Sequence, residues 1–240
     1  MNQCPGCSCS DHVSLKERTK AKYDEQWASQ DERASAQRRK SLSMVSDPLL
    51  SMVHPLSGKV VVDLGIGTGS LAFRAMELCP PKRMIGIDFS GPGLCVARGI
   101  SRSERFKDMD FDVLRADLER LPISNRSVDV VLSQATINLL PDKAAAMKEI
   151  ARITRSGARV AISDAFKTTK CSEGGSWEQC IGGAVTVGEF SSLALNAGLI
   201  ISGQVDLTQQ VKSLVASKKW DWPEFVQHNM DYRGFLLLRS

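Results

Sequence analysis

A glycine-rich segment directly after an apolar run is the clearest chemical signal in the chain. Residues 60–69 read VVVDLGIGTG, and a helical pattern begins at Ser70. Glycine adopts positive φ without strain and has no side chain, so Gly65, Gly67 and Gly69 allow a tight turn in which the backbone approaches a ligand closely. The spacing therefore predicts a turn that holds a nucleoside or an amino-acid group against the main chain.

A carboxylate at the end of the next predicted strand indicates which ligand the turn holds. Residues 83–88 form a stretch that ends in Asp88, and Phe89 follows it. A carboxylate here can accept hydrogen bonds from both hydroxyls of a ribose. The spacing is G-x-G-x-G rather than the G-x-G-x-x-G of nicotinamide and flavin sites, and the turn carries no basic side chain for a pyrophosphate. We therefore expect a nucleoside cofactor without phosphate, with Asp88 and Phe89 beside it.

Asp63 is the acidic residue inside the glycine segment itself. The residues before it are all apolar, so its carboxylate is expected close to the turn, where backbone amides can satisfy it. It either tethers the loop or meets an ammonium group of the cofactor through water. Both roles place Asp63 at the ligand site.

The elements that must position these groups alternate between strand and helix. This alternation predicts an α/β fold with a doubly wound, mostly parallel sheet that has helices on both faces. Predicted strands span 59–64, 83–88, 110–115, 128–133 and 158–163, and predicted helices span 71–79, 92–103 and 142–154. Ligands of such sheets lie at the carboxyl ends of the strands, which selects as lining candidates Asp63, Asp88, Asp117, residues 133–135 and Asp164.

The two ends of the chain complete this plan. We expect a flexible arm over residues 1–15, then one or two helices up to residue 56 that are broken near Pro48 and Pro55. Residues 1–56 then form an N-terminal arm with cap helices, and residues 57–240 form the ligand-binding domain. The basic run 38–40 is expected on a solvated helix face.

The last third of the chain carries a helix start signal and two strands. Thr186 and Glu189 form the T-x-x-E pattern of a capping box, which predicts a helix from that point. Strands are expected at 199–207 and 234–238.

Composition excludes several classes of protein. With 240 residues, 42% hydrophobic and 24% charged, the chain is expected to be one globular unit. The net charge of +4 comes from 31 basic and 27 acidic residues, which is too even a balance for a nucleic-acid partner. No apolar run has membrane-spanning length and the amino terminus is polar, so we expect a cytoplasmic protein with reduced cysteines and no membrane partner.

With these motifs in place, the chain resembles the class I S-adenosylmethionine-dependent methyltransferases. Residues 61–69, VVDLGIGTG, are similar to the first motif of that family, whose second strand also ends in an acidic residue. The resemblance implies S-adenosylmethionine as cofactor, S-adenosylhomocysteine as product, and a Rossmann-like sheet of seven strands whose last two form an antiparallel hairpin. It also implies that Asp117 and Leu118 read the adenine edge, whereas outside the family pattern an aspartate there is as often a turn former.

Two further segments make the chain similar to the arsenite methyltransferases in particular. Residues 133–143 contain Ile-Asn-Leu and then Asp-Lys, and residues 176–184 read SWEQCIGGA. The resemblance implies Cys180 as a thiolate ligand of trivalent arsenic, while a lone cysteine beside apolar residues is otherwise an inert small hydrophobe.

In the arsenite methyltransferases, the segment similar to residues 133–143 runs past the methyl group of the donor. Ser133 and Gln134 are accordingly expected at the cofactor. Either Gln134 or Asn138 can orient the cofactor or a substrate oxygen; the alternative is that Asn138 is a helix-side polar residue and Asp142 a helix N-cap.

The second thiol needed to chelate arsenic stays open. Arsenite methyltransferases use further cysteines, one of them near or beyond the last strand, whereas this chain has no cysteine after Cys180. The candidates are Cys171, which is nearest in sequence, the terminal cluster of Cys4, Cys7 and Cys9, and the two residues expected in the core, Cys79 and Cys95.

Three functions are compatible with the sequence. The leading hypothesis is methyl transfer from S-adenosylmethionine to thiolate-bound trivalent arsenic, with arsenite and a thiol as the expected small-molecule substrate. The second is methyl transfer to a small organic acceptor at oxygen, nitrogen or carbon, for which Asp164 or His228 is the candidate base. The third is a noncatalytic cofactor sensor or thiol-rich metal binder. The sequence leaves the oligomeric state open.

Overall fold

The computed structural model describes residues 9–168 and 174–240. Its helices are α1 (Cys9–Ala28), α2 (Glu32–Ser51), α3 (Ser70–Leu78), α4 (Gly91–Ser101), α5 (Lys143–Ile153), α6 (Val187–Asn196), α7 (Thr208–Ala216) and α8 (Pro223–Gln227), with short 3-10 turns η1 (Ile137–Leu139) and η2 (Trp177–Gln179). Its strands are β1 (Val60–Leu64), β2 (Arg83–Asp88), β3 (Phe111–Arg115), β4 (Val128–Gln134), β5 (Thr154–Lys167), β6 (Val185–Thr186), β7 (Leu199–Asp206) and β8 (Asp231–Arg239).

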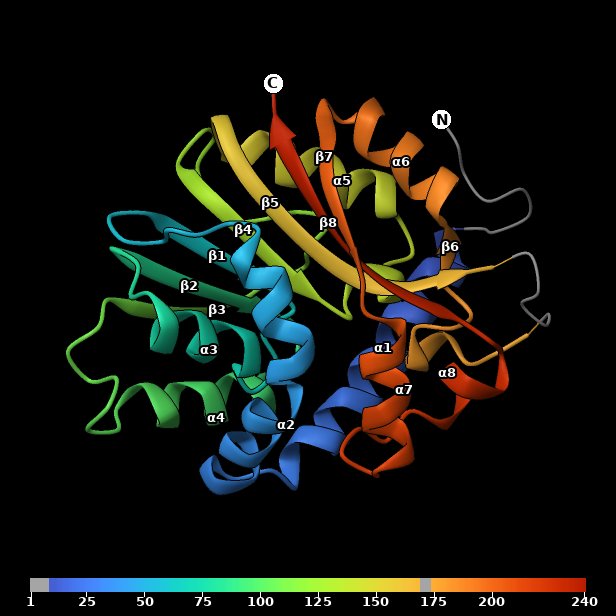
Figure 1. Ribbon diagram of the computed structural model, residues 1–240, viewed down its shortest axis with the longest axis horizontal. Helices are drawn as coiled ribbons and strands as arrows, with labels where there is room; N and C mark the ends of the chain where they lie inside the picture. Colours follow the sequence, from blue (N-terminus) through green and yellow to red (C-terminus); the bar gives the residue numbers. More distant parts are fainter. Residues whose placement is uncertain (1–8, 169–173) are drawn as a thin grey trace.

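A single mostly parallel sheet forms the centre of the molecule (Figure 1). The strand order is β3-β2-β1-β4-β5-β8-β7, and the first five strands of this order run parallel. β8 is antiparallel to both β5 and β7, which confirms the predicted closing hairpin. The two-residue β6 also pairs with β5, so in the described part of the chain the sheet has eight strands rather than the seven expected. The chain order reverses between β1 and β4, and a ligand crevice opens there in folds of this type.

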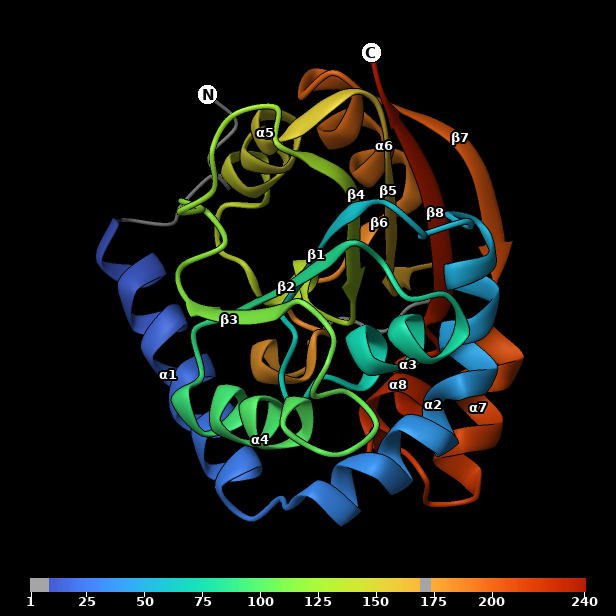
Figure 2. The same cartoon turned by 90° about the vertical axis from the view of Figure 1, so that its left-hand side faces the viewer.

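Helices cover both faces of the sheet, as Figures 1 and 2 show from two sides. Side chains alternate between the faces along a strand, so adjacent buried residues enter different layers. Val62 packs in the layer of α5 and α6, whereas its neighbour Val61 packs in the layer of α2, α3 and α4. This double burial explains why the parallel strands read as continuous apolar runs, and it confirms the doubly wound arrangement.

A third apolar cluster lies beyond the carboxyl ends of the strands. It joins α7 and α8 to the loop after β5 and includes Cys180, Trp220, Trp222, Phe225 and Tyr232. The strand and helix patterns did not predict α7 and α8. Their positions show that residues 208–227 form a wall beside the crevice rather than an open connection.

The N-terminal region differs from its prediction in two ways. α1 already begins at Cys9, inside the segment expected to be a flexible arm. α2 continues through Pro48 to Ser51 instead of breaking there. A proline inside a helix costs about 3 kcal/mol, but Val45, Leu49 and Leu50 on the same helix are fully buried, and that packing offsets the lost hydrogen bond.

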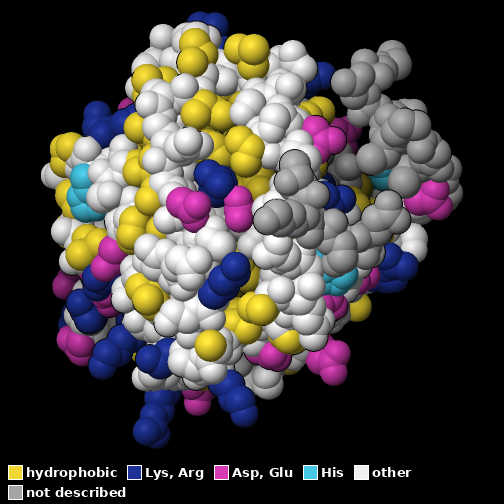
Figure 3. Space-filling model, turned by 45° about the vertical axis from the view of Figure 1, so that its right-hand side comes forward, with side chains coloured by type: hydrophobic (Ala, Val, Ile, Leu, Met, Phe, Trp, Pro, Cys, Tyr) yellow, Lys and Arg dark blue, Asp and Glu magenta, His cyan; other side chains and the backbone are white. Residues whose placement is uncertain are grey.

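The surface of the described residues gives two further observations. No helix among them is long and apolar enough to cross a membrane. On the face shown in Figure 3, basic and acidic side chains lie interspersed.

The predicted capping box at α6 is confirmed and gives a test of local stability. Thr186 Oγ1 accepts a hydrogen bond from the Glu189 amide (3.2 Å), and the Glu189 carboxylate accepts one from the Thr186 amide (2.7 Å). We expect Thr186→Ala to lower the free energy of unfolding by about 1 kcal/mol. The Glu189 amide then has no side-chain acceptor, and the Glu189 carboxylate loses its hydrogen bond from the Thr186 hydroxyl. Urea unfolding followed by circular dichroism measures this change.

A matched control lies on the same helix. Ser192 is exposed and its hydroxyl donates only to the Gly188 carbonyl. Ser192→Ala should leave the stability unchanged or raise it by a few tenths of a kcal/mol, because alanine has the higher helix propensity. Equal losses in the two variants would contradict the assigned role of the cap.

Candidate functional site

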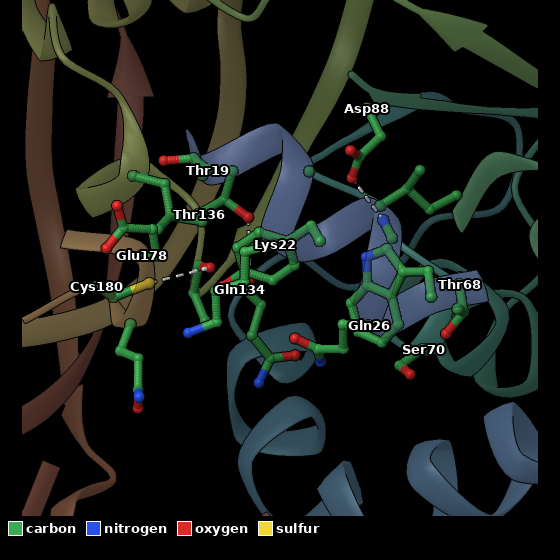
Figure 4. A pocket seen from close by; sticks show the side chains of 18 of the residues that line it. Thr19, Lys22, Gln26, Thr68, Ser70, Asp88, Gln134, Thr136, Glu178 and Cys180 are labelled. Carbon is green, nitrogen blue, oxygen red and sulfur yellow. Dashed lines mark hydrogen bonds between the residues drawn. The ribbon is translucent and has the colours of Figure 1, made fainter. Parts of the chain in front are cut away.

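A cavity of about 610 Å³ lies at the carboxyl ends of the parallel strands. The glycine turn after β1, the end of β2 and the end of β4 form its floor, while α1 and α2 cover it. The loop that carries Cys180 and the segment with Trp220 and Trp222 close its far end. Figure 4 shows Asp88 on one side of this cavity and Cys180 on the other.

The glycine turn is shaped by close contacts with distant parts of the chain. Gly65 has φ of +73°, and a Cβ atom there would lie 2.2 Å from the Thr136 hydroxyl oxygen. Gly67 has φ of +53°, and its Cβ would lie 3.3 Å from the Trp27 ring. Both positions therefore need glycine for conformation and for space. The predicted close approach of backbone is present, with Trp27 of α1 lying over the turn.

Asp88 links the end of β2 to this turn. Its Oδ2 accepts a hydrogen bond from the Gly67 amide and its Oδ1 accepts one from the Ser90 amide, both at 2.8 Å. Burial raises the pKa of this carboxyl. Each oxygen can accept a second hydrogen bond, so the carboxylate is fixed in place and remains able to accept from ribose hydroxyls.

Asp63 is fully enclosed behind the glycine turn and also lines the cavity. Burial raises its pKa well above the ordinary range. Its Oδ2 atom has no hydrogen-bond partner among the described residues. A buried oxygen without a partner is unfavourable unless a ligand donates to it, so this atom fits an ammonium group of a bound molecule.

Asp117 and Leu118 lie at the mouth of the same cavity. The Asp117 carboxylate accepts hydrogen bonds from Lys16 Nζ of α1 (2.7 Å) and from the Glu119 amide (2.9 Å). Lys16 also bridges to the Glu119 carboxylate. Leu118 is buried, and Phe89 lines the cavity beside the end of β2. A helix that precedes the sheet by many residues is thus tied to the residues expected at the adenine.

The far end of the cavity carries Cys180. This residue has φ of +66° and is buried, and its Sγ donates to the Ala135 carbonyl oxygen at 3.6 Å. Burial raises the pKa of the thiol well above its ordinary range. Burial therefore favours the neutral thiol over the free thiolate before arsenic is bound. Tyr23, Trp220 and Trp222 line the cavity on this side.

Gln134 is the residue of the β4 end that reaches the cavity. Its Oε1 accepts a hydrogen bond from the Ser46 hydroxyl of α2 at 2.9 Å. Its Nε2 has no partner among the described residues, which leaves a donor for a ligand. Ser133 does not line the cavity, because its side chain points into the sheet and donates to the Leu64 carbonyl.

Asn138 and Asp164 form a buried structural tie rather than part of the cavity lining. The Asn138 side chain donates to Asp164 Oδ1 (2.9 Å) and to the Ala165 carbonyl (2.6 Å). Asp164 also accepts from the backbone amides of Thr136, Asn138 and Ala165. Asp164 was expected at the cavity, but these four donors hold it in the interior. Asp142 is the N-cap of α5, as the alternative interpretation of that segment predicted.

The other cysteines separate by position. Cys79 is partly buried and its Sγ accepts from the Leu56 amide, whereas Cys95 is exposed on α4, so the prediction that Cys95 lies in the core is wrong. Cys4, Cys7 and Cys171 lie outside the described residues, and of Cys9 the structure describes only the backbone at the start of α1. Within the described part of the chain, no cluster of three or more potential metal ligands occurs.

Many of the residues that line the cavity were not predicted from the sequence, and those from the N-terminal helices include three large side chains. Tyr23 and Trp27 come from α1 and Arg38 comes from α2. The run 38–40 was expected on a solvated face, but Arg39 pairs with Glu77 at 3.0 Å and Arg38 lines the cavity. The helical spacing of Ser35, Arg38 and Leu42 could have indicated an inward face.

Comparisons with known proteins agree with this geometry. A family model described as a methyltransferase domain matches residues 55–221. The arsenite methyltransferase of Halobacterium salinarum is 29% identical over 170 residues, a match that covers 68% of this chain and 42% of that protein. A malonyl-(acyl-carrier protein) O-methyltransferase of a Marinomonas species is 33% identical over 152 residues, covering 63% of this chain and 53% of that protein.

The likeness extends to solved structures at the level of the fold. A geranyl diphosphate methyltransferase in complex with SAM superimposes with a TM-score of 0.69 at 17% identity, covering 82% of this chain and 85% of that chain. The chain spans about half the length of the curated relatives that it matches.

The tie around Asp164 gives a test of pH dependence. Burial raises the pKa of this carboxyl from 3.8 to about 6. The native protein then binds more protons than the unfolded chain between these values, so this group makes the free energy of unfolding fall by about 3 kcal/mol in total as the pH rises from about 3 to about 7. Asp164→Asn cannot titrate, and the difference in stability between wild type and variant should shrink by that amount over this pH range. Urea unfolding at several pH values measures it, and a difference that stays constant with pH would contradict the assignment.

Proposed function

The chain belongs to the methyltransferase-domain family and uses S-adenosylmethionine as its cofactor, and from this premise we propose that it transfers the methyl group to trivalent arsenic held by a thiol. The observation that carries the proposal is the position of Cys180. Its buried thiol lines the same cavity as the glycine turn, on the side away from Asp88. The similarity to the arsenite methyltransferase of Halobacterium salinarum supports the same acceptor.

At the cofactor end of the cavity, we assign a group of the protein to each part of S-adenosylmethionine. Asp88 accepts from the ribose hydroxyls, and Asp117 with the Leu118 amide reads the adenine edge. Gly65, Gly67 and Gly69 leave the backbone bare for the remainder of the molecule. The partnerless oxygen of Asp63 supports this assignment, because it matches the ammonium group of the cofactor.

Cys180 acts as a neutral thiol when it takes up arsenic. The sulfur forms a bond to arsenic, and the thiol proton leaves with the displaced hydroxide as water, or with a displaced thiolate as thiol. The high pKa of Cys180 is compatible with this exchange, because the proton is transferred to the leaving group and no free thiolate is needed.

When bound, S-adenosylmethionine supplies an electrophilic methyl group on a positively charged sulfur. The acceptor on Cys180 attacks with a lone pair that carries no proton, so the residues around it need not act as a base. Their role is to align the acceptor and to exclude water, which α1, Trp220 and Trp222 do by covering the cavity. Alignment of this kind can contribute roughly 7–11 kcal/mol to lowering the barrier.

The second arsenic ligand is proposed to be a cysteine whose side chain the structure does not describe. Among those described, Cys180 is the one cysteine that lines the cavity. Cys171 and the terminal cluster of Cys4, Cys7 and Cys9 remain the candidates. α1 begins at Cys9, the last cysteine of this cluster, and the same helix contributes residues to the cavity lining.

Replacement of Cys180 tests the proposal directly. We expect Cys180→Ser to lower the rate of arsenite methylation at least about 100-fold, equivalent to about 2.7 kcal/mol, because an oxygen ligand binds arsenic poorly. The affinity for S-adenosylhomocysteine should change less than about threefold. Serine has nearly the same shape at this positive-φ position, so the variant isolates the sulfur. Product mass spectrometry and calorimetry provide the two measurements.

Cys95→Ser is the matched control, because Cys95 is exposed on α4 and lies outside the cavity. Its turnover should equal that of wild type. Unchanged arsenite turnover in Cys180→Ser, with cofactor binding retained, would falsify the arsenic role of Cys180.

A small organic acceptor is the second candidate, and the aromatic wall of Tyr23, Trp220 and Trp222 favours it. Neither Asp164 nor His228 lines the cavity, so such an acceptor would have to react without these two as the base. A screen for release of S-adenosylhomocysteine separates the candidates: turnover of arsenite should require added thiol, whereas turnover of an organic acceptor should not. Cofactor binding without any product would instead identify the chain as a sensor or a metal binder.

A further inference from the structure

Lys143, Trp177 and Gly183 lie in the two segments on which the similarity to arsenite methyltransferases rests, yet none of them lines the cavity. The first segment, residues 133–143, follows β4 through η1 to the start of α5. The second, residues 176–184, contains η2 and forms the loop that carries Cys180. The structure brings η1 and η2 into contact, so the two segments meet although they are far apart in the chain.

The Trp177 indole makes one of the contacts between them. Its Nε1 donates a hydrogen bond to the Leu139 carbonyl oxygen of η1 at 3.0 Å. Trp177 also begins η2, and its backbone carbonyl accepts from the Cys180 amide at 3.0 Å. The indole therefore ties the turn that ends in Cys180 to the segment after β4.

Lys143 places a buried cation against the same ring. It begins α5, is 9% exposed, and its Nζ lies 4.8 Å from the centre of the Trp177 ring. The same Nζ donates to the Leu140 carbonyl oxygen at 2.9 Å. Burial raises the pKa of Asp164, and the positive charge of Lys143 opposes that rise. A cation loses hydration on burial, and here an aromatic face, a carbonyl and a carboxylate compensate for the loss.

Gly182 and Gly183 allow the loop to approach η1 this closely. A Cβ atom at Gly183 would lie 2.0 Å from the Asn138 carbonyl oxygen and 3.3 Å from the Trp177 ring. A Cβ atom at Gly182 would lie 3.0 Å from the Trp177 amide nitrogen. Cys180 itself has φ of +66°, a conformation that persists in a residue other than glycine only where surrounding contacts impose it. The packing of the loop against η1 and α5 supplies such contacts.

We propose that Lys143 and Trp177 form a clamp that positions Cys180 for the acceptor. The clamp holds the Cys180 loop against η1, so the sulfur is placed at the cavity before any ligand binds. Both are positioning residues, because neither lines the cavity. The inference rests on the proposed role of Cys180 in taking up arsenic.

Alkylation of the protein by iodoacetamide, read at each cysteine by mass spectrometry, tests the clamp without turnover. Cys180 is 3% exposed, so it reacts when the loop opens locally. In Lys143→Met, which keeps an apolar stem and removes the charge, the rate at Cys180 should rise about 10-fold, because a buried cation–π contact is lost. Cys79, whose Sγ accepts from the Leu56 amide, serves as the reference within the same sample and should react at an unchanged rate.

A double-mutant cycle identifies the partner of the lysine. In a Trp177→Leu background the ring is absent, so Lys143→Met should change the rate at Cys180 less than about twofold. Lys148→Met is the matched control, because Lys148 is exposed on the same helix. It should react as wild type does.

Turnover provides a second readout. With arsenite, thiol and S-adenosylmethionine, Lys143→Met should lower kcat about 10-fold, whereas KM for S-adenosylmethionine should change less than about threefold. The clamp aligns the acceptor, and cofactor binding does not depend on it.

Three results would overturn the proposal. An unchanged rate at Cys180 in Lys143→Met would show that the loop is held without the cation. Equal increases at Cys180 and Cys79 would indicate a general loss of stability. A 10-fold effect of Lys143→Met that persists in the Trp177→Leu background would place the action of the lysine elsewhere. Alkylation needs no acceptor, so absence of arsenite turnover in wild type would refute the proposed function and leave the test of the clamp intact.

Discussion

The bare backbone of the glycine turn is the constraint on which the rest of the site depends. A side chain at Gly65 would occupy the position of Thr136, and one at Gly67 would press on Trp27. A Cβ at Gly93 would in turn lie 3.1 Å from the Gly67 carbonyl oxygen. The loop after β4, the start of α4 and helix α1 therefore all converge on a turn that presents main chain alone. Larger residues at these positions would push apart the elements that enclose the cavity.

Hydrogen-bond satisfaction separates the structural acidic residues at this edge of the sheet from those available to a ligand. Asp164 accepts from four nearby donors and connects β5 to the loop after β4. Asp88 accepts from two amides and keeps unused acceptor capacity. Asp63 retains an oxygen without any partner among the described residues. Buried polar groups normally have hydrogen-bond partners, so the number of hydrogen bonds that each carboxylate accepts indicates which one is available to a ligand.

Helix α1 connects the two ends of the cavity. Lys16 binds Asp117 on the adenine side, and Arg18 pairs with Glu178 (3.1 Å) in the loop that carries Cys180. The same helix contributes Tyr23 and Trp27 to the lining. A displacement of α1 would therefore alter the cofactor end and the acceptor end together. The ion pairs are partly exposed and individually weak, whereas Trp27 is buried and adds apolar contact between the helix and the glycine turn.

The sequence by itself determined the sheet, the glycine turn and Asp88, because apolar runs, glycine spacing and the T-x-x-E cap at Thr186 act over a few neighbouring residues. Only the tertiary structure decided that α2 continues through Pro48, that Arg38 rather than Arg39 faces the cavity, and that Cys180 is buried there. These outcomes depend on contacts between segments far apart in the chain, such as Ser35 with Thr68 and Lys16 with Asp117. Local patterns specify which elements form, but the burial and charge of a side chain follow from what packs against it, and that is fixed only when the distant segments meet.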